Sequence, residues 1–270
     1  MRLVGLTIYP LKSGAGIELE RATLVATGLE LDRRFMLVDR DGDFVTLRGN
    51  PRLVTVRSTL ANDTVCFEVA ASGLEPLRLS LTPGDGPVEQ IEVQIWGDYL
   101  PATWVSQAAD AWFSTLLKKP VHLVRFDEPV QRQVELSYAQ VGDSVQFADG
   151  FPLLVTGTAS LAALSERFGH EVAMSRFRPN LVIETSEAFI EDRWTQIRVG
   201  AIAIDIAKPC ARCVGVNVEP GTGRTSKEPL ATLAKMRTRD GKVFFGQNAI
   251  HRGVGVLSLG DQVEVVAMES

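Results

Sequence analysis

The chain has 270 residues, of which 45% are apolar and 23% are charged, and its formal net charge is −5. This composition is sufficient for a large core and excludes general disorder, while a negative charge without any run of lysines or arginines argues against nucleic acid or an anionic membrane as the main partner. No apolar segment approaches the roughly 18 residues that a spanning helix needs, and residues 1–10 are too short and too weakly cationic for a secretory signal. Three cysteines suit a reducing compartment. We therefore expect a soluble, cytoplasmic protein.

Short runs rich in β-branched residues, separated by turn residues, dominate the first part of the chain. They predict strands at 3–8, 22–26, 35–39, 44–47, 53–60, 65–69 and 91–95. The sequence Asp39-Arg40-Asp41-Gly42 is typical of a hairpin turn between two of these strands. The first helix is expected to begin after the N-cap Ser106 and to bury a face made by Trp112, Phe113, Leu116 and Leu117.

The second part of the chain continues this pattern after a polar stretch, 127–150, that predicts a loop between the halves. A strand at 152–155 precedes a helix in which Leu161, Leu164 and Phe168 have helical spacing. Further strands are predicted at 181–184, 201–206, 214–218, 243–245 and 263–267, with a short helix at 229–236. Many short strands with few helices indicate a mainly β fold with some helix (α+β), in which twisted sheets close into barrels.

Two of the three thiols, Cys210 and Cys213, lie three residues apart between predicted strands. The neighbouring Lys208 and Arg212 would favour the thiolate, which suits either a soft metal or sulfur transfer. Three plainer interpretations stay open: half of a zinc site, a redox dithiol, or two buried thiols without chemistry. A zinc site would need two more ligands from Cys66, His122, His170 and His251.

Four segments have side chains suited to a small anion. Lys12 and Ser13 follow the first strand through a turn, and Arg178 and Asn180 precede another strand. Arg33 and Arg34 lead into a strand whose alternation points them in opposite directions, so that one of them can face a pocket. Thr156, Thr158 and Ser160 join a strand to a helix, where hydroxyls and backbone N–H groups meet the positive end of the helix dipole. Helix capping is the plain alternative for these hydroxyls, and a surface position is the plain alternative for Arg178.

In chain order these motifs resemble a known family. Tyr9-Pro10-Leu11-Lys12-Ser13, Asp32-Arg33-Arg34-Phe35 and Pro51-Arg52-Leu53 resemble the N-terminal β-barrel domain that precedes a MOSC domain. Five later motifs resemble the MOSC domain itself, which is named for the C-terminus of molybdenum cofactor sulfurases. They are Phe177-Arg178-Pro179-Asn180, Glu191-Asp192-x-Trp194, Cys210-Ala211-Arg212-Cys213, Glu228-Pro229-Leu230 and Phe245-Gly246-Gln247-Asn248. The resemblance covers nearly the whole chain and is closest to two-domain bacterial relatives of the mitochondrial amidoxime-reducing component.

The resemblance implies two interleaved domains, a barrel-like N-terminal one at 1–121 and a MOSC barrel at 122–270. It implies a molybdenum cofactor (molybdopterin) held between them, with the Cys213 thiolate as the molybdenum ligand and the catalytic residue. The residues that it assigns to cofactor binding are Lys12, Ser13, Arg34, Thr156, Thr158, Ser160, Arg178, Asn180 and Cys210.

The activity that the resemblance implies is reduction of small N-hydroxylated substrates such as amidoximes and hydroxylamines. No cysteine follows Cys213, and three thiols cannot ligate an iron–sulfur cluster with four thiolates, so electrons are expected from a separate donor protein. Two other functions stay open: a sulfur carrier or transferase that forms a persulfide on Cys213 or Cys210, and a non-catalytic carrier of the cofactor.

Overall fold

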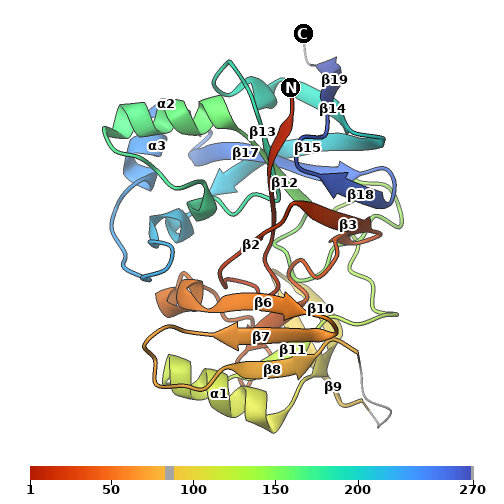
Figure 1. Cartoon of the computed structure of the whole chain (residues 1–270), viewed down its shortest axis with the longest axis vertical. Coiled ribbons are helices and arrows are strands. Elements are labelled where there is room, and N and C mark those ends of the chain that lie inside the picture. Colours follow the sequence, from red (N-terminus) through yellow and green to blue (C-terminus); the bar gives the residue numbers. More distant parts are fainter. Residues whose placement is uncertain (83–87, 269–270) are drawn as a thin grey trace.

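A nine-stranded sheet forms the upper lobe of the computed structural model, which describes residues 1–82 and 88–268 (Figure 1). Its path runs through β19 (Val263–Met268), β14 (Trp194–Val199), β15 (Ile202–Arg212), β17 (Lys242–His251), β12 (Leu153–Gly157), β13 (Leu181–Ile183), β1 (Leu3–Ile8) and β2 (Ile17–Glu18), and β16 (Thr238–Arg239) pairs with β17. β12 and β13 pair in parallel, and the other neighbours pair antiparallel. The starts of β1 and β19 meet at the isolated bridge Arg2–Gln262, so the sheet curls back on itself without a closing ladder among the described residues.

The two ends of the chain fold together in this lobe. β1 pairs with β13, and a second sheet of three strands places β3 (Arg21–Val25) between β18 (Gly255–Ser258) and β4 (Gly28–Leu29). Leu6 and Leu24 therefore share one apolar core with Ile197 and Ile204. This exchange of strands confirms the predicted interleaved organisation.

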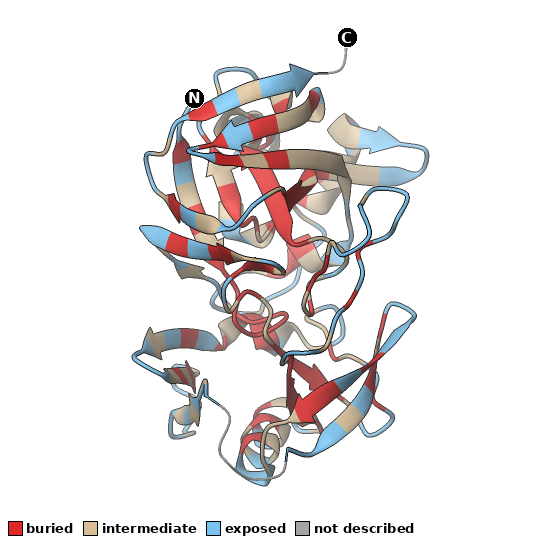
Figure 2. Cartoon of the chain, turned by 90° about the vertical axis from the view of Figure 1, so that its right-hand side faces the viewer, coloured by how far each residue is buried: buried red, intermediate tan, exposed pale blue. Residues whose placement is uncertain are grey.

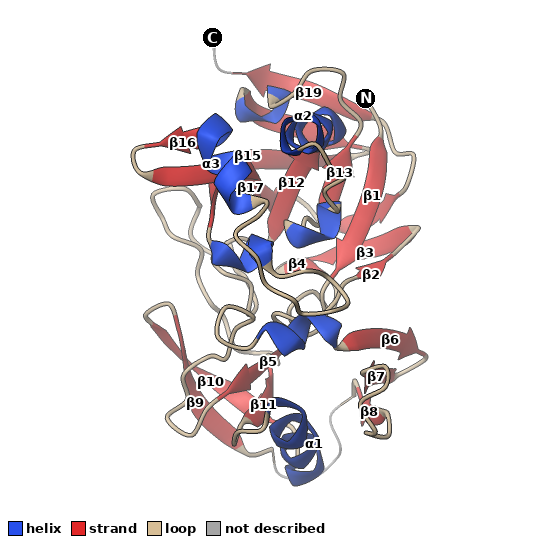
Figure 3. Ribbon diagram, turned by 90° about the vertical axis from the view of Figure 1, so that its left-hand side faces the viewer, coloured by secondary structure: helices blue, strands red, loops and turns tan. Residues whose placement is uncertain are grey.

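The lower lobe contains the middle of the N-terminal half (Figure 3). One sheet has the order β5 (Phe35–Val38), β11 (His122–Arg125), β10 (Asp98–Trp104) and β9 (Gln90–Ile95), and a second has the order β6 (Arg57–Ala61), β7 (Thr64–Glu68) and β8 (Leu77–Ser80). Helix α1 (Gln107–Leu117) begins as predicted, because the Ser106 side chain accepts a hydrogen bond from the amide of Ala109. Its residues Phe113 and Leu116 are buried against Phe67 of β7, which joins the helix to the second sheet.

Two further helices pack against the upper sheet (Figure 1). α2 (Thr158–Phe168) and α3 (Leu230–Arg237) contribute Leu164 and Leu233 to a core that also contains Phe177 and Phe245. The rings of Phe177 and Phe245 stack with their centroids 4.0 Å apart. This core is adjacent to Arg178, which follows Phe177 in the chain, and it includes the first half of β17 through Phe245.

Three predicted strands are wrong in whole or in part. Residues 53–55 belong to the 3-10 helix η1 (Pro51–Thr55), whose first position suits proline, and the strand β6 begins only at Arg57. Residues 214–217 form the 3-10 helix η4 (Val214–Asn217), since Asn217 is buried and its side chain accepts a hydrogen bond from the amide of Leu230. The segment 44–47 makes one bridge, Val38–Phe44, and otherwise forms a loop.

The other predicted strands are present with shifted ends, and the mainly β fold with some helix is confirmed. Two more 3-10 helices, η2 (Met174–Arg176) and η3 (Ile190–Asp192), stand in the connections between strands. Buried residues continue from the strands of both lobes into the loops that join them (Figure 2). The junction of the lobes is therefore a packed region of the molecule, and the candidate site lies there.

Candidate functional site

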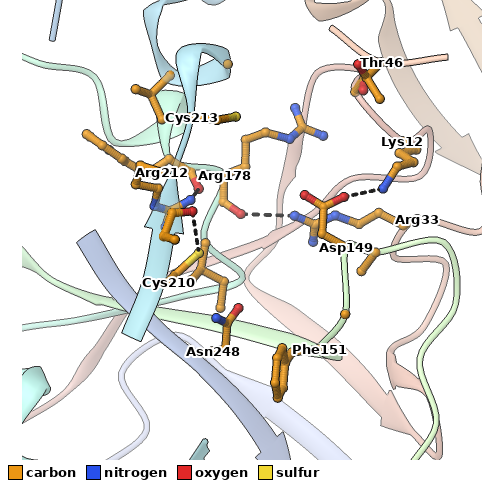
Figure 4. A pocket seen from close by; sticks show the side chains of 18 of the residues that line it. Lys12, Arg33, Thr46, Asp149, Phe151, Arg178, Cys210, Arg212, Cys213 and Asn248 are labelled. Atoms are coloured by element: carbon orange, nitrogen blue, oxygen red, sulfur yellow. Dashed lines mark hydrogen bonds and ion pairs between the residues drawn. The ribbon is translucent and has the colours of Figure 1, made fainter. Parts of the chain in front are cut away.

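A cavity of about 400 Å³ lies where the two lobes meet (Figure 4). We call it the central cavity, and its walls come from the N-terminal loops, the 148–154 segment, the 176–180 segment and the end of β15. Its volume is in the range of pockets that hold small molecules and cofactors. The loop 127–150, predicted to lie between the halves, thus ends in its wall.

The two cysteines enter this cavity from irregular positions of β15. The pairing of β15 with β17 shifts register between Ile206 and Lys208 and again between Pro209 and Ala211, which are irregularities that re-aim side chains. Cys210 is half-buried, whereas Cys213 follows the last residue of the strand and is exposed. Burial raises the pKa of the Cys210 thiol, so this sulfur favours the neutral form. The two thiols therefore differ in their surroundings.

Two arginines that line the same cavity have buried donors without a partner among the described residues. Arg212 donates from Nε to the carbonyl of Phe245 at 2.9 Å and from Nη1 to the carbonyl of Phe177 at 3.0 Å. Arg178 donates from Nη1 to the carbonyl of Gly14. In both residues the Nη2 atom is buried and has no hydrogen-bond partner among the described residues. Buried donors of fixed charge without partners suit an anionic ligand.

Arg178 remains a cation at neutral pH despite its burial. Burial, followed by the neighbouring charge of Arg33, lowers the pKa of Arg178 to about 10. The Tyr9 ring lies between the two guanidinium groups, 4.2 Å from that of Arg178 and 4.3 Å from that of Arg33. Asn180 accepts a hydrogen bond from Arg33 at 3.2 Å and donates to the carbonyl of Thr7 at 3.1 Å. These contacts join the two arginines to the end of β1 and to the segment before β13.

Lys12 lies on the opposite wall. Its Nζ donates to the carbonyl of Phe147 at 2.8 Å and pairs with Asp149 at 2.5 Å. Burial lowers the pKa of Lys12, and Asp149 opposes this effect. Desolvation would raise the pKa of the Asp149 carboxyl, but the ammonium of Lys12 outweighs it and holds this pKa below its usual range.

Backbone strain gathers at the cavity. Ser13, Arg33, Trp96 and Arg178 all line it and all have positive φ, at 71°, 51°, 57° and 55°. Side-chain-bearing residues adopt this conformation at a cost, and such residues cluster at functional sites. The strain supports the assignment of the central cavity as the functional site.

The structure brings together six of the ten site residues proposed from the sequence. Those that line the central cavity are Lys12, Ser13, Arg178, Asn180, Cys210 and Cys213. Arg34 lies elsewhere and pairs with Asp127 at 2.9 Å, while its neighbour Arg33 faces the cavity. The alternation of the Arg33-Arg34 doublet had left this choice open.

The remaining three residues, Thr156, Thr158 and Ser160, lie around the start of α2 and outside the walls of the cavity. The helix start already holds a carboxylate, because Glu191 accepts hydrogen bonds from Ser160 Oγ at 2.8 Å and from the amide of Gly157 at 3.2 Å. Thr158 Oγ1 accepts a hydrogen bond from the amide of Thr185 at 3.0 Å. A carboxyl group of the protein itself thus occupies this terminus, where the sequence had predicted a phosphate.

Sequence reasoning missed the parts of the wall that come from loops. Asp149, Trp96 and Arg48 line the cavity, and Asn248 of the Phe245–Asn248 motif also lies there beside Cys210. Charge and aromaticity in segments between strands were the available signals, but the sequence does not show which loops meet. Within the described residues, no group of three or more His, Cys, Asp and Glu side chains gathers as a metal site.

Comparison with known proteins gives matches over both lobes. Residues 1–120 match the model of the MOSC N-terminal beta barrel domain, and residues 142–264 match the model of the MOSC domain. Mitochondrial amidoxime-reducing component 1 of Homo sapiens is 31% identical over 96% of this chain and 81% of its own length, and that of Mus musculus is 32% identical over 96% and 80%.

The crystal structure of YUAD protein from Bacillus subtilis covers 97% of this chain and 93% of its own, but at 8% identity and a TM-score of 0.43 the likeness carries no argument. The helices in the described part of the chain fall short of the length and apolarity that a membrane crossing requires.

Proposed function

We propose a function for this chain from its family: it belongs to the MOSC domain family and carries the family's N-terminal beta barrel domain. The proposed function is that of a molybdenum-cofactor-binding oxidoreductase that reduces N-hydroxylated substrates. One observation supports this function above the others. The exposed thiol of Cys213 shares a cavity with two buried guanidinium groups whose Nη2 atoms lack partners among the described residues. A soft metal and an organic phosphate need this combination of groups.

The residues of the cavity fit such a cofactor. Cys213 is the proposed molybdenum ligand, since its sulfur stands at the end of β15 and is open to the cavity. Arg178 and Arg212 are the proposed partners of the phosphate, because each can add a charge-assisted hydrogen bond from Nη2. Lys12, Ser13 and Asn180 are proposed to hold the organic part from the other walls, and Cys210 is proposed to pack beside the metal as a neutral thiol.

The proposed reaction removes the hydroxyl oxygen of the substrate. An amidoxime takes up two electrons and two protons, its N–O bond breaks, and an amidine and water are released. The bound cofactor would supply the oxygen-accepting metal and the two-electron chemistry. The protein would supply the thiolate, the fixed positive charges and a walled site, and a separate donor protein is proposed to deliver the electrons.

The test compares wild type with Cys213→Ser and Cys210→Ser, and Cys66→Ser serves as the matched control because Cys66 is a half-buried thiol of β7 in the lower lobe. Each protein is produced in a host that makes the cofactor and is assayed for molybdenum and for benzamidoxime reduction by a chemically reduced dye.

Wild type and Cys66→Ser should hold near-stoichiometric molybdenum and reduce the substrate, Cys210→Ser should be weakened, and Cys213→Ser should be inactive. Molybdenum without reduction would indicate a cofactor carrier, and a stable extra sulfur on a cysteine, seen by mass spectrometry, would indicate sulfur transfer. Equal losses in both cysteine variants would contradict the assignment of Cys213.

A further inference from the structure

Arg48 is held differently from the other cations of the central cavity. Lys12 pairs with Asp149 and Arg33 pairs with Asp32, whereas Arg48 is exposed and lies within ion-pair distance of no carboxylate in the described part of the chain. Its guanidinium instead lies over the ring of Trp96, with its carbon 4.5 Å from the ring centroid. The hydrogen-bonding edge of this guanidinium is therefore available to a ligand.

Trp96 is a rigid support for this arginine. Its Nε1 donates to Asp149 at 3.2 Å, its ring packs on Phe44 with centroids 5.1 Å apart, and yet 52% of the residue is exposed. Its φ of 57° is costly for an aromatic residue, and it shares this conformation with Ser13, Arg33 and Arg178 in the same cavity. Trp96 stands in the turn between β9 and β10, where it lines the cavity and remains half exposed.

Arg48 also lies close to the proposed metal ligand. A methyl group built on Gly215 would stand 3.5 Å from Cys213 Sγ and 3.9 Å from Arg48 Cγ. The two atoms are thus no farther apart than the sum of these distances, and the guanidinium of Arg48 lies over the Trp96 ring. A small molecule held by Arg48 can therefore reach the metal side with its other end.

We propose that Arg48 is a specificity-determining residue that binds a carboxylate of the substrate, so that the preferred substrates are N-hydroxylated compounds with an anionic group. This inference rests on the function proposed above. A guanidinium fork matches a carboxylate in two parallel hydrogen bonds, and its stacking on Trp96 restricts the side chain before binding. The same charge repels an amidinium product, which is a stronger base than the amidoxime from which it forms.

The test uses holoprotein and two substrates with the same reacting group, benzamidoxime and para-carboxybenzamidoxime. Wild type should show the higher kcat/KM for the carboxylated compound, and Arg48→Gln should lower the ratio of the two kcat/KM values about tenfold, the typical effect of one hydrogen bond to a charged group. Arg48→Lys should keep part of the preference. Arg40→Gln is the matched control, since Arg40 is exposed in the 39–42 turn and does not line the cavity.

A binding measurement separates this inference from the proposed function. Calorimetry with para-carboxybenzamidine, which cannot be reduced, should show about tenfold weaker binding to Arg48→Gln than to wild type, with molybdenum content unchanged. If wild type reduces neither substrate, the proposed function fails, while this titration still tests Arg48. An unchanged ratio and unchanged binding in Arg48→Gln would overturn the inference, and so would loss of molybdenum, because Arg48 would then hold the cofactor.

Discussion

Replacing Gly246 by alanine tests whether β17 must pass β12 without a side chain at this point. Gly246 has a φ of 73°, and an added Cβ would lie 2.7 Å from Thr156 Cγ2 and 2.8 Å from the carbonyl oxygen of Val155. The left-handed conformation costs a non-glycine residue about 1–2 kcal/mol, and overpacking costs about 1–3 kcal/mol more. The carbonyl cannot move away easily, since Val155 pairs with Gln247 in the β12–β17 ladder.

Together these effects predict a loss of about 2–5 kcal/mol in the free energy of unfolding, or roughly 5–15 °C in Tm for a chain of this size. The assay is thermal unfolding followed by circular dichroism. Gly241→Ala is the matched control, because Gly241 has a φ of 72° and its Cβ would meet no atom within 4 Å. It should lose only the conformational part, about 1–2 kcal/mol. Equal Tm values for the two variants would refute the reasoning, since packing at Gly246 would then cost nothing.

Two more predictions concern titrating groups. Burial raises the pKa of Glu191 above the ordinary 4.5, so the folded state binds this proton more tightly than the unfolded chain and stability falls as pH rises from 4.5 through the folded pKa. Glu191→Gln should therefore show a smaller difference in urea midpoint between about pH 5 and about pH 7 than wild type, and an equal difference would contradict the role given to burial. In protein purified without cofactor, iodoacetamide should modify exposed Cys213 before Cys210, whose pKa burial raises, and mass spectrometry that finds Cys210 modified first would contradict this order.

Local signals in the sequence predicted what local contacts decide. The N-cap Ser106 and the apolar spacing that follows it require no distant partner, and α1 begins and packs as they indicate. The alternation of 3–8 similarly predicted β1, although its partner β13 is far along the chain. The strand predicted at 214–218 failed for the opposite reason. Its alternating valines fit a strand, but the tertiary hydrogen bond from the amide of Leu230 to buried Asn217 favours a 3-10 helix.

The start of α2 shows why an anion site cannot be read from hydroxyls alone. Hydroxyl groups and free amides at a helix N-terminus attract a negative charge, but they do not distinguish a ligand from a side chain of the same protein. Here Glu191, which lies beyond the end of α2 in sequence, reaches back to Ser160 and the amide of Gly157. The hydroxyl-rich start of α2 is thus explained by its contacts with Glu191 without any ligand.

The central cavity differs from that helix start in one physical respect, because its donors are not satisfied within the described part of the chain. Arg178 and Arg212 each donate hydrogen bonds to backbone carbonyls, which fix their side chains. In each residue one buried Nη2 atom has no partner among the described residues. A buried donor left in this state costs about 1–3 kcal/mol, so the two donors destabilise the protein alone, and an anion that reached them would remove this cost. Free energy that ligand binding recovers in this way adds to affinity and, by linkage, to the stability of the loaded protein. If the proposed anion binds there, the same two side chains would connect the strained backbone of Arg178 to the choice of a negatively charged ligand.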